Sequence, residues 1–423
     1  MKPSVHFCLP ESFQPGEFLR TPQLIRLADD ARYFMSLILT KTAHDQVDDS
    51  GHVRLMAKHL RSIMHKHHYK QVVDALLVGG AVKRVAYQVG ECSFGYQLAE
   101  RFHRDKHVRI AAQDPRLVDR LRLFHEQAEQ ERQSRMKPVH FALERHQRRL
   151  SIDGNQAHDI IESLPPASNP WDCQGILVRD IQEKNFHVKV GRYGRLTNNI
   201  TSMKREIRSA LRLGSESLKH VDISCCQPAL IGRAAKQAEQ HPEIGQNQSK
   251  EENRLVSIYD APDSPHCRGD LEVYCELVQS GQFYDFMLAK LKIGPCQNLT
   301  REDLKKRFLT DVVAKRKANW HGAEYPSDIE DRFRALFPSL YKFIRDINCD
   351  GWEHKNLIRQ MQQEESKLVI ETVAADLIVR HPEVFVLTLH DAIFTTASGI
   401  PVVVGAFEAA FDQIGYPMTL KVA

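Results

Sequence analysis

Residues 384–396 read VFVLTLHDAIFTT, a mostly apolar run interrupted by the pair His390-Asp391. A short buried strand, a polar pair and a returning strand are typical of a hairpin, so this pattern places a carboxylate at the hairpin tip. Residues 221–230, VDISCCQPAL, carry a second acid in a similar setting, because Asp222 lies in an apolar stretch that gives way to a helical pattern. The sequence therefore predicts two aspartates at strand tips.

A basic helix is the third decisive segment. Residues 300–315 carry Arg301, Lys305, Leu309 and Val313 at intervals of four, which places them on one face of a helix. Paired carboxylates can hold two Mg²⁺ ions for an in-line phosphoryl displacement, and an Arg and a Lys one turn apart can neutralise a triphosphate. Either aspartate alone is more often a turn or cap residue, so this chemistry depends on the three segments together.

The ordered segments resemble the palm and fingers motifs of the family A DNA polymerases and the related single-subunit phage RNA polymerases. In that superfamily a palm strand carries Asp, with Ser two residues later and a sugar-selecting residue five residues later. The fingers helix carries Arg, then Lys, then an apolar or aromatic residue at steps of four, and the last palm motif is an apolar strand followed by His-Asp. The matching residues are Asp222, Ser224 and Gln227, then Arg301, Lys305 and Leu309, then His390 and Asp391.

Three further short matches occur in the family's order within residues 191–423. They are the Gly-Arg element at Gly194-Arg195, the Phe-Pro helix start within residues 333–340 and the Thr-Ala-Ala-Asp-like helix at residues 372–377. The resemblance implies a helix-rich α/β fold of the α+β type, with an antiparallel palm sheet and helical fingers. The implied polymerase core is 171–423, with the palm at 171–235 and 335–423 and the fingers at 236–334.

The resemblance also implies a role for each matched residue. Asp222 and Asp391 would bind two Mg²⁺ ions, with Mn²⁺ as a substitute, and Lys305 would contact the triphosphate and protonate the leaving pyrophosphate. The other implied contacts are Arg301 with the γ-phosphate, Leu309 with the substrate on the same helix face, His390 beside the primer terminus, Gln227 with the sugar and Arg195 with backbone phosphate. The implied partners are a DNA primer–template, or RNA in its place, and nucleoside triphosphates.

Departures from the family pattern leave several functions open. Val313 stands where a tyrosine is expected, Gln227 where the DNA enzymes usually have Glu, and Ala392 follows His-Asp in place of Glu. We expect a DNA polymerase-like nucleotidyltransferase of a phage, plasmid or other mobile element. The alternatives are a primase-like or RNA-synthesising polymerase, and a non-catalytic DNA-binding replication or defence factor that retains the fold.

The basic charge of the chain is concentrated in its middle. The whole sequence has a net charge of +4, from 58 Lys and Arg against 54 Asp and Glu, whereas residues 52–150 hold 20 of the former and 10 of the latter. Helical patterns at 52–67 and 69–77, a Gly79-Gly80 stop and two strand-like segments near 82–98 resemble a winged helix. We therefore expect a basic winged-helix-like domain at 52–110, or, in the alternative interpretation, a helical platform with solvated cations.

Six basic residues are additional candidates for nucleic-acid contact. They are Lys66, Lys70, Lys83 and Arg84 in the basic domain and Arg205 and Arg208 on a helix after Arg195. A solvated surface is the alternative for each set. Only the salt dependence of binding distinguishes the two interpretations.

The remaining segments complete the expected organisation. Residues 1–51 are predicted as an N-terminal helical segment, 111–170 as a helical connector and linker, and 239–270 as a long polar loop. Nine irregularly spaced cysteines favour reduced thiols. No stretch reaches the roughly 18 apolar residues of a membrane span, so the sequence predicts a cytoplasmic protein without a membrane partner.

Overall fold

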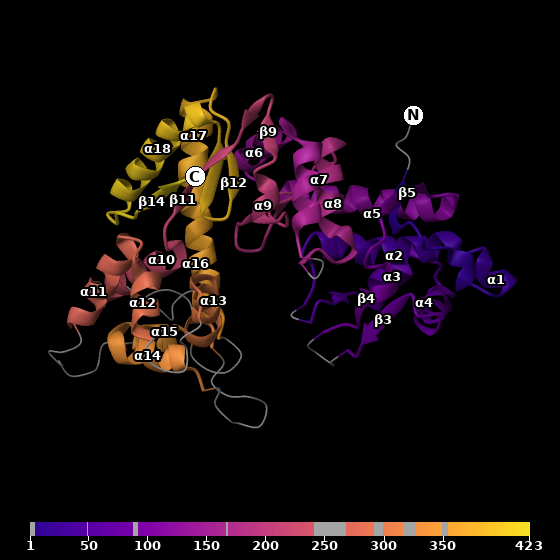
Figure 1. Ribbon diagram of the computed structural model, residues 1–423, viewed down its shortest axis with the longest axis horizontal. Helices are drawn as coiled ribbons and strands as arrows, with labels where there is room; N and C mark the ends of the chain where they lie inside the picture. Colours follow the sequence, from indigo (N-terminus) through magenta and orange to yellow (C-terminus); the bar gives the residue numbers. More distant parts are fainter. Residues whose placement is uncertain are drawn as a thin grey trace. The chain divides into compact units, whose positions relative to one another are not determined.

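The computed structural model describes most of the chain, namely residues 5–48, 50–87, 92–165, 168–240, 268–291, 299–315, 326–348 and 354–423. The chain forms two compact units, the first from residues 1–137, 147–189 and 197–217 and the second from 138–146, 190–196 and 218–423. Helices predominate, and the strands pair in small antiparallel sheets (Figure 1). The predicted helix-rich α+β fold is confirmed. The domain boundaries at residues 51, 110 and 170 stay predictions.

One region of the first unit combines three helices with a three-stranded antiparallel sheet. Helix α2 (Ala28–Ala43) is followed by β2 (Val53–Arg54), α3 (Ala57–Ile63), α4 (Tyr69–Val78), β3 (Val82–Val85) and β4 (Gly95–Leu98). The three strands pair in the order β2-β4-β3, and α2 packs against α4 and β4. The first helix of the arrangement is therefore α2, from the segment that the sequence analysis set apart.

One detail of this region differs from the sequence expectation. The helix predicted from residue 52 begins at Ala57, because Val53 and Arg54 pair with Tyr96 and Gly95 as a strand. Helix α4 ends directly before the two glycines, as predicted. The predicted turn between the two strands falls partly on residues 88–91, which lie outside the described residues.

Other elements of the first unit complete its core. Strand β1 (His6–Pro10) pairs with β5 (His107–Ala111). Helix α5 (Pro115–Ser134) lies in the predicted helical connector. Helix α6 (Pro138–Arg148) follows it, and most of α6 belongs to the second unit. The remaining elements are η1 (Pro15–Glu17), α1 (Pro22–Ile25), η2 (Glu100–Phe102), β6 (Leu150–Ile152), α7 (Gly154–Ser163), η4 (Pro170–Asp172), α8 (Cys173–Gln182), β7 (Val188–Val190), β8 (Leu196–Asn198), α9 (Arg205–Arg208), β9 (Leu211–Leu213) and β10 (Glu216–Ser217).

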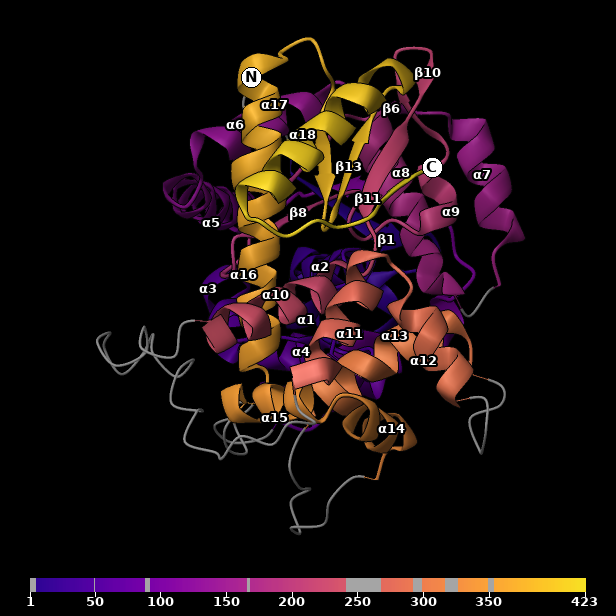
Figure 2. The same cartoon turned by 90° about the vertical axis from the view of Figure 1, so that its left-hand side faces the viewer.

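A four-stranded antiparallel sheet organises the second unit. Its order is β12-β13-β11-β14, from the strands Leu387–Leu389, Ala392–Thr395, Lys219–Ile223 and Leu420–Val422. Helix α18 (Ile400–Gln413), preceded by η8 (Ala397–Gly399), packs against β11 and β13. Figure 2 shows α16 (Asn356–Ser366) and α17 (Ala375–Arg380) continuing one another through the π-helical segment η7 (Lys367–Ala374).

The helices between the strands form a second layer of structure in this unit. They are α10 (Cys226–Gln240), α11 (Arg268–Gln279), α12 (Phe283–Leu291), α13 (Arg301–Arg307), η6 (Phe308–Val313), α14 (Asp328–Leu336) and α15 (Pro338–Ile347). An aromatic cluster of fully buried side chains holds them together, with members Tyr274, Phe283, Phe308, Phe333 and Phe337. Burial of each such ring stabilises the fold by roughly 1.5–3 kcal/mol. Of the predicted loop 239–270, residues 241–267 lie outside the described residues.

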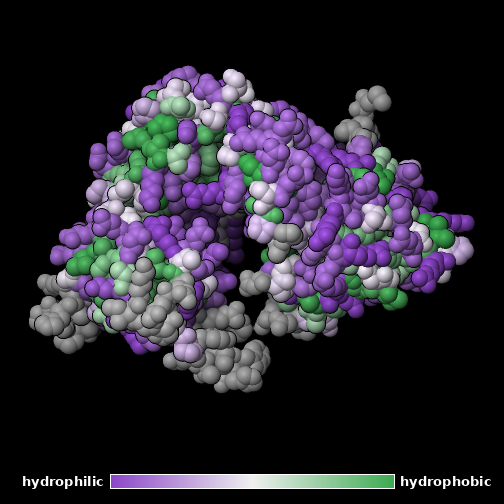
Figure 3. All heavy atoms as spheres, viewed as in Figure 1, coloured by the Kyte–Doolittle hydropathy of each residue, from purple (hydrophilic) through white to green (hydrophobic). Residues whose placement is uncertain are grey.

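The surface in Figure 3 is mostly hydrophilic, with apolar atoms gathered over α18. In the part of the chain that the structure describes, every helix is too short or too polar to cross a bilayer.

Candidate nucleotidyl-transfer site

The two aspartates predicted at strand tips are neighbours at one end of the sheet. Strand β11 pairs with β13 so that Asp222 lies opposite Ala392, the residue after Asp391. The Ile223 amide donates to the Asp391 carbonyl oxygen over 3.2 Å. The two-residue turn between β12 and β13 requires a left-handed backbone, and His390 has φ 55°. Hairpin and cross-strand register together bring the two carboxylates to one place.

A cavity of about 220 Å³ opens beside these carboxylates. Helix α13 lines it with Arg301 and Lys305, and the following turn lines it with Leu309. Gln227, from the start of α10, lines it as well. The cavity therefore gathers seven residues that matched the motifs: Asp222, Ser224, Gln227, Arg301, Lys305, Leu309 and Asp391.

Helix α13 is set in place by its first turn and its last turn. Thr300 and Asp303 form a capping box, in which the Asp303 amide donates to the Thr300 hydroxyl over 3.1 Å. Beyond Arg307 the helix widens into the π turn η6. Because a π turn contains about one residue more than an α turn, Val313 leaves the face of Leu309 and is fully buried. The predicted one-face row therefore ends at Leu309.

Tyr284 is a cavity residue that the sequence analysis missed. Its ring centroid lies 5.6 Å from the Arg301 guanidinium carbon and 5.6 Å from Lys305 Nζ. The ring is buried, and burial raises the pKa of its hydroxyl well above the usual range. Cation–π contact with both side chains fixes the two cations relative to each other. Its position in an apolar helix made it indistinguishable from a core residue.

Two lysines of the cavity wall were missed too. Lys421 on β14 lies directly opposite Asp222 in the strand register, and Lys306 follows Lys305 on α13. A cation opposite a carboxylate is a favourable cross-strand pair. The C-terminal strand gave no motif that would have singled out Lys421.

Glu365, at the end of α16, connects two of the predicted residues. Its Oε2 accepts from an Arg195 guanidinium nitrogen at 2.7 Å and from the Gln227 amide nitrogen at 3.4 Å. The Glu365 side chain is 2% exposed, and Oε1 has no hydrogen-bond partner among the described residues. An unpaired oxygen of a buried carboxylate destabilises the folded state. A hydrogen-bond donor or a cation bound beside Glu365 would therefore be stabilising.

Crowding of acids dominates the electrostatics of the site. Burial, followed by the nearby charges of Asp222 and Glu365, raises the pKa of Asp391 to about 8, whereas Arg195 acts in the opposite direction. Burial likewise raises the pKa of the Cys225 and Cys226 thiols. The two cysteines are therefore packing residues rather than thiolate nucleophiles.

The donor set fits a divalent cation of the Mg²⁺ type. Two adjacent carboxylates repel each other, and a cation between them would relieve this repulsion. Among the described residues, no cluster of three or more His, Cys, Asp or Glu side chains is placed to hold a metal ion. Mg²⁺ commonly takes one or two carboxylates and completes its shell with water and substrate phosphates. Asp222 and Asp391 are therefore the residues that would hold such ions.

Several predicted residues lie elsewhere. His390 is exposed at the hairpin tip. Arg195 lies near the carboxylates, where it pairs with Glu365. The others belong to the first unit: Lys66, Lys70, Lys83, Arg84, Arg205 and Arg208.

The basic residues of the first unit differ in their surroundings. Lys66 and Lys70 are exposed. Lys83 Nζ pairs with Glu100 at 2.6 Å, and an Arg84 guanidinium nitrogen lies 3.8 Å from Asp74.

Comparison with solved structures finds matching chains, and a polymerase domain is among them. The chain is similar to the POL domain of Pol1 from M. smegmatis, solved in complex with DNA primer-template and dNTP. The TM-score is 0.40 at 11% sequence identity, and the match covers 61% of this chain. The chain spans about half of that domain, since 50% of it is covered. No family model and no curated protein matches the chain.

Proposed function

We propose that this protein is a template-directed nucleotidyltransferase that extends a 3′-hydroxyl with nucleoside triphosphates. One observation carries the proposal: a single cavity gathers the adjacent carboxylates Asp222 and Asp391 with Arg301 and Lys305. Phosphoryl transfer needs positioning and charge stabilisation more than covalent chemistry, and this cavity offers both signs of charge for that purpose. Its partners would be a DNA primer–template and nucleoside triphosphates, in phage, plasmid or mobile-element replication.

The residues divide the work between the two sides of the cavity. Divalent ions held by Asp222 and Asp391, Mg²⁺ or in its place Mn²⁺, would supply a clamp on the attacking and leaving oxygens. Arg301 would hold the γ-phosphate end of the triphosphate, and Lys305 would donate a proton to the leaving pyrophosphate. Tyr284 holds both cations through its ring face, so neither has to be ordered when the substrate arrives.

Recognition of the sugar would depend on Gln227. Its amide nitrogen contacts the buried Glu365, and this contact fixes the side chain at the cavity wall. A fixed amide there would crowd a ribose 2′-hydroxyl, so we favour deoxynucleotides. The RNA-synthesising alternative is tested in the same assay by supplying ribonucleotides, and Gln227→Ala is expected to relax the sugar preference by about tenfold, a typical value for one lost contact.

Primer extension tests the proposed activity. Asp222→Asn and Asp391→Asn should each lower extension of a primed DNA template by at least about 10³-fold, since each variant loses a carboxylate that would hold the divalent ions. Binding of the same DNA, measured by fluorescence anisotropy, should change little. Asp412→Asn is the matched control, because Asp412 is exposed on α18 outside the cavity.

Two outcomes would contradict the proposal. If both cavity variants extend primers as well as the parent protein, the assignment of the carboxylates is wrong. If the parent protein binds DNA but extends no primer with either nucleotide set and with Mg²⁺ or Mn²⁺, the non-catalytic DNA-binding alternative replaces it.

A further inference from the structure

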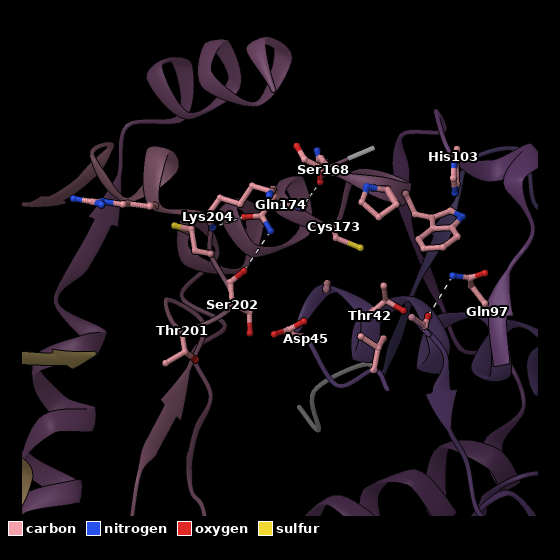
Figure 4. A pocket seen from close by; sticks show the side chains of 18 of the residues that line it. Thr42, Asp45, Gln97, His103, Ser168, Cys173, Gln174, Thr201, Ser202 and Lys204 are labelled. Atoms are coloured by element: carbon pink, nitrogen blue, oxygen red, sulfur yellow. Dashed lines mark hydrogen bonds between the residues drawn. The ribbon is translucent and has the colours of Figure 1, made fainter. Parts of the chain in front are cut away.

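A second and larger cavity lies wholly within the first unit. Its volume is about 600 Å³, within the range of sites that bind small organic ligands. Four chain segments line it: the end of α2 with the loop after it, β4 with the turn after it, residues 168–174, and residues 201–208 (Figure 4). None of the residues of the proposed transfer site belongs to it.

One wall of this cavity is cationic. Lys204, Arg205 and Arg208 line it in succession, and none of the three forms an ion pair with a described acid. The Arg208 Nε donates to the Met203 carbonyl oxygen over 2.9 Å. Burial and the neighbouring Arg205 lower the pKa of Arg208. Glu206 acts on Arg208 in the opposite direction, but less strongly than burial and Arg205 do. An anion bound here would relieve the remaining repulsion between the two guanidinium groups.

A rigid scaffold carries this wall. The Gln174 carboxamide accepts from the Lys204 amide at 2.8 Å and donates to the Ser202 carbonyl at 3.3 Å (Figure 4). The Asn169 side chain in turn accepts from the Gln174 amide at 2.9 Å. These bonds hold the 202–204 backbone in one conformation. The backbone at Lys204 is therefore held in place, and the Arg208 guanidinium is held by the Met203 carbonyl.

Strained backbone lies in the same scaffold. Trp171 (φ 52°, ψ 32°) and Asp172 (φ 44°, ψ 40°) are consecutive non-glycine residues in the left-handed region. Each costs on the order of 1–3 kcal/mol, and such residues gather at ligand sites. The Trp171 indole donates to the Ala99 carbonyl at 3.3 Å, and its ring meets His103 edge-on at 4.6 Å. Together they keep an aromatic surface in the cavity wall.

Acceptors complete the lining. Asp45, from the loop after α2, contributes a carboxylate, and its backbone is also left-handed with φ 54°. Gln97 and Thr42 add neutral polar groups (Figure 4). A ligand that fits must carry an anionic end for the cations and hydrogen-bond donors for the carboxylate. A nucleotide carries both, in its phosphate and in its sugar or base.

We propose that this cavity is a second nucleotide site, separate from the transfer site and specific for a nucleotide phosphate. Lys204, Arg205 and Arg208 bind the phosphate, and Asp45 accepts a hydrogen bond from the sugar or base. The phosphate comes either from a free nucleotide or from the 5′ end of a strand. The proposal does not depend on the proposed polymerase activity.

Direct mapping tests the location. The full chain is labelled with 8-azido-ATP in EDTA, digested, and analysed by mass spectrometry. We expect labelled peptides from residues 42–47, 97–103 or 168–208, and protection of these peptides by excess ATP. Label confined to other peptides would overturn the proposal.

Affinity measurements test the residues. In the Arg301→Ala/Lys305→Ala background, which weakens the transfer site, calorimetry with ATP should show one site, and adding Lys204→Ala/Arg205→Ala should weaken it at least about tenfold. The matched control is Lys58→Ala/Arg116→Ala, which removes the same charge from exposed positions of the first unit. Equal weakening by the control pair would show a bulk charge effect and overturn the proposal.

Affinities for different ligands distinguish the two sources of phosphate. A free-nucleotide site binds ATP more tightly than a 5′-phosphorylated ten-nucleotide strand, whereas a strand-end site shows the reverse order and prefers the 5′-phosphorylated strand to its 5′-hydroxyl counterpart. Either order of affinities supports the proposal, provided that the Lys204→Ala/Arg205→Ala change abolishes the difference between the two ligands. Inorganic phosphate that binds as tightly as the best nucleotide probe would overturn the nucleotide assignment.

Discussion

Two basic surfaces of this protein have different surroundings. The α13 row (Arg301 and Lys305) faces a cavity that also holds two aspartates, and an aromatic ring fixes both cations. The wing cations (Lys83 and Arg84) are exposed on β3 and lie beside Glu100 and Asp74. The number of cations is the same in both places. Arg301 also pairs with Asp285 at 3.1 Å, whereas Lys305 forms no ion pair with a described acid. What differs is therefore that one α13 cation is unpaired and that the Tyr284 ring holds both cations at the cavity, and this decides how much a phosphate can gain from them.

The largest test of this contrast removes the α13 row. Arg301→Ala/Lys305→Ala should lower primer extension by about 10²–10⁴-fold, because each lost charged contact to a phosphate is worth about 1.5–3 kcal/mol. Steady-state extension rates at fixed DNA give the measurement. Lys83→Ala/Arg84→Ala provides the control with the same charge change. A tenfold or greater loss of rate in that control would erase the distinction between the two surfaces.

The next largest effect is expected from removing the aromatic packing that supports helix α13. Phe308→Ala should destabilise the protein by about 3–5 kcal/mol, since Phe308 is fully buried in the aromatic cluster directly after α13. Urea unfolding followed by circular dichroism gives the value. Phe124→Ala serves as comparison, because Phe124 is 36% exposed and should cost much less. Similar losses for the two would mean that the cluster does not support α13.

The pH dependence of stability tests the contact between Asp30 and the segment that carries Lys66. Asp30 accepts from the His65 amide at 2.5 Å, and burial raises its pKa from 3.8 to about 6. The folded state therefore binds the Asp30 proton more tightly than the unfolded state. The contribution of Asp30 to the free energy of unfolding is therefore fully present below pH 4 and is lost as the pH rises to 6. The loss is on the order of 2–3 kcal/mol.

The variant Asp30→Asn keeps an oxygen acceptor and removes the titration. Its free energy of unfolding, from urea titrations at pH 4 and pH 7, should change less between the two values than that of the parent. Parallel pH dependence in the two proteins would contradict the assignment.

Tyr284→Leu should have a smaller effect. It removes the ring face but keeps apolar volume, and each cation–π contact is worth about 0.5–2 kcal/mol. We expect a threefold to thirtyfold rise in the KM for nucleotide, with a smaller change in kcat. Tyr284→Phe keeps the ring and should behave like the parent. Equal losses in both variants would assign the effect to the hydroxyl instead.

The smallest effect concerns salt. Lys66 and Lys70 are exposed without an ion pair to a described acid, so Lys66→Ala/Lys70→Ala should reduce the slope of log affinity against log salt by up to about 2. Lys83→Ala/Arg84→Ala should reduce it by less than about 1, because ion pairs already occupy these cations. Equal changes for the two pairs would show that the intramolecular ion pairs do not compete with DNA.

The sequence predicted the parts of the site that depend on local pattern. The apolar strands around Asp222 and Asp391 and the four-residue spacing of Arg301, Lys305 and Leu309 depend on short-range periodicity. Glu365, Tyr284 and Lys421 depend on contacts between segments distant in the chain, and such contacts leave no local signal. The displacement of Val313 was also hidden, since a π turn looks like an α-helix in sequence.

The two π-helical segments have a consequence for how the molecule tolerates change. A π turn is equivalent to one extra residue in a helix, so the side chains before and after it follow different phase angles. Because of this offset, α13 lines the polar cavity with Arg301 and Lys305, whereas η6 places Val312 and Val313 in the buried core. A substitution in α13 therefore changes the cavity wall without changing which residues of η6 are buried, and the reverse also holds.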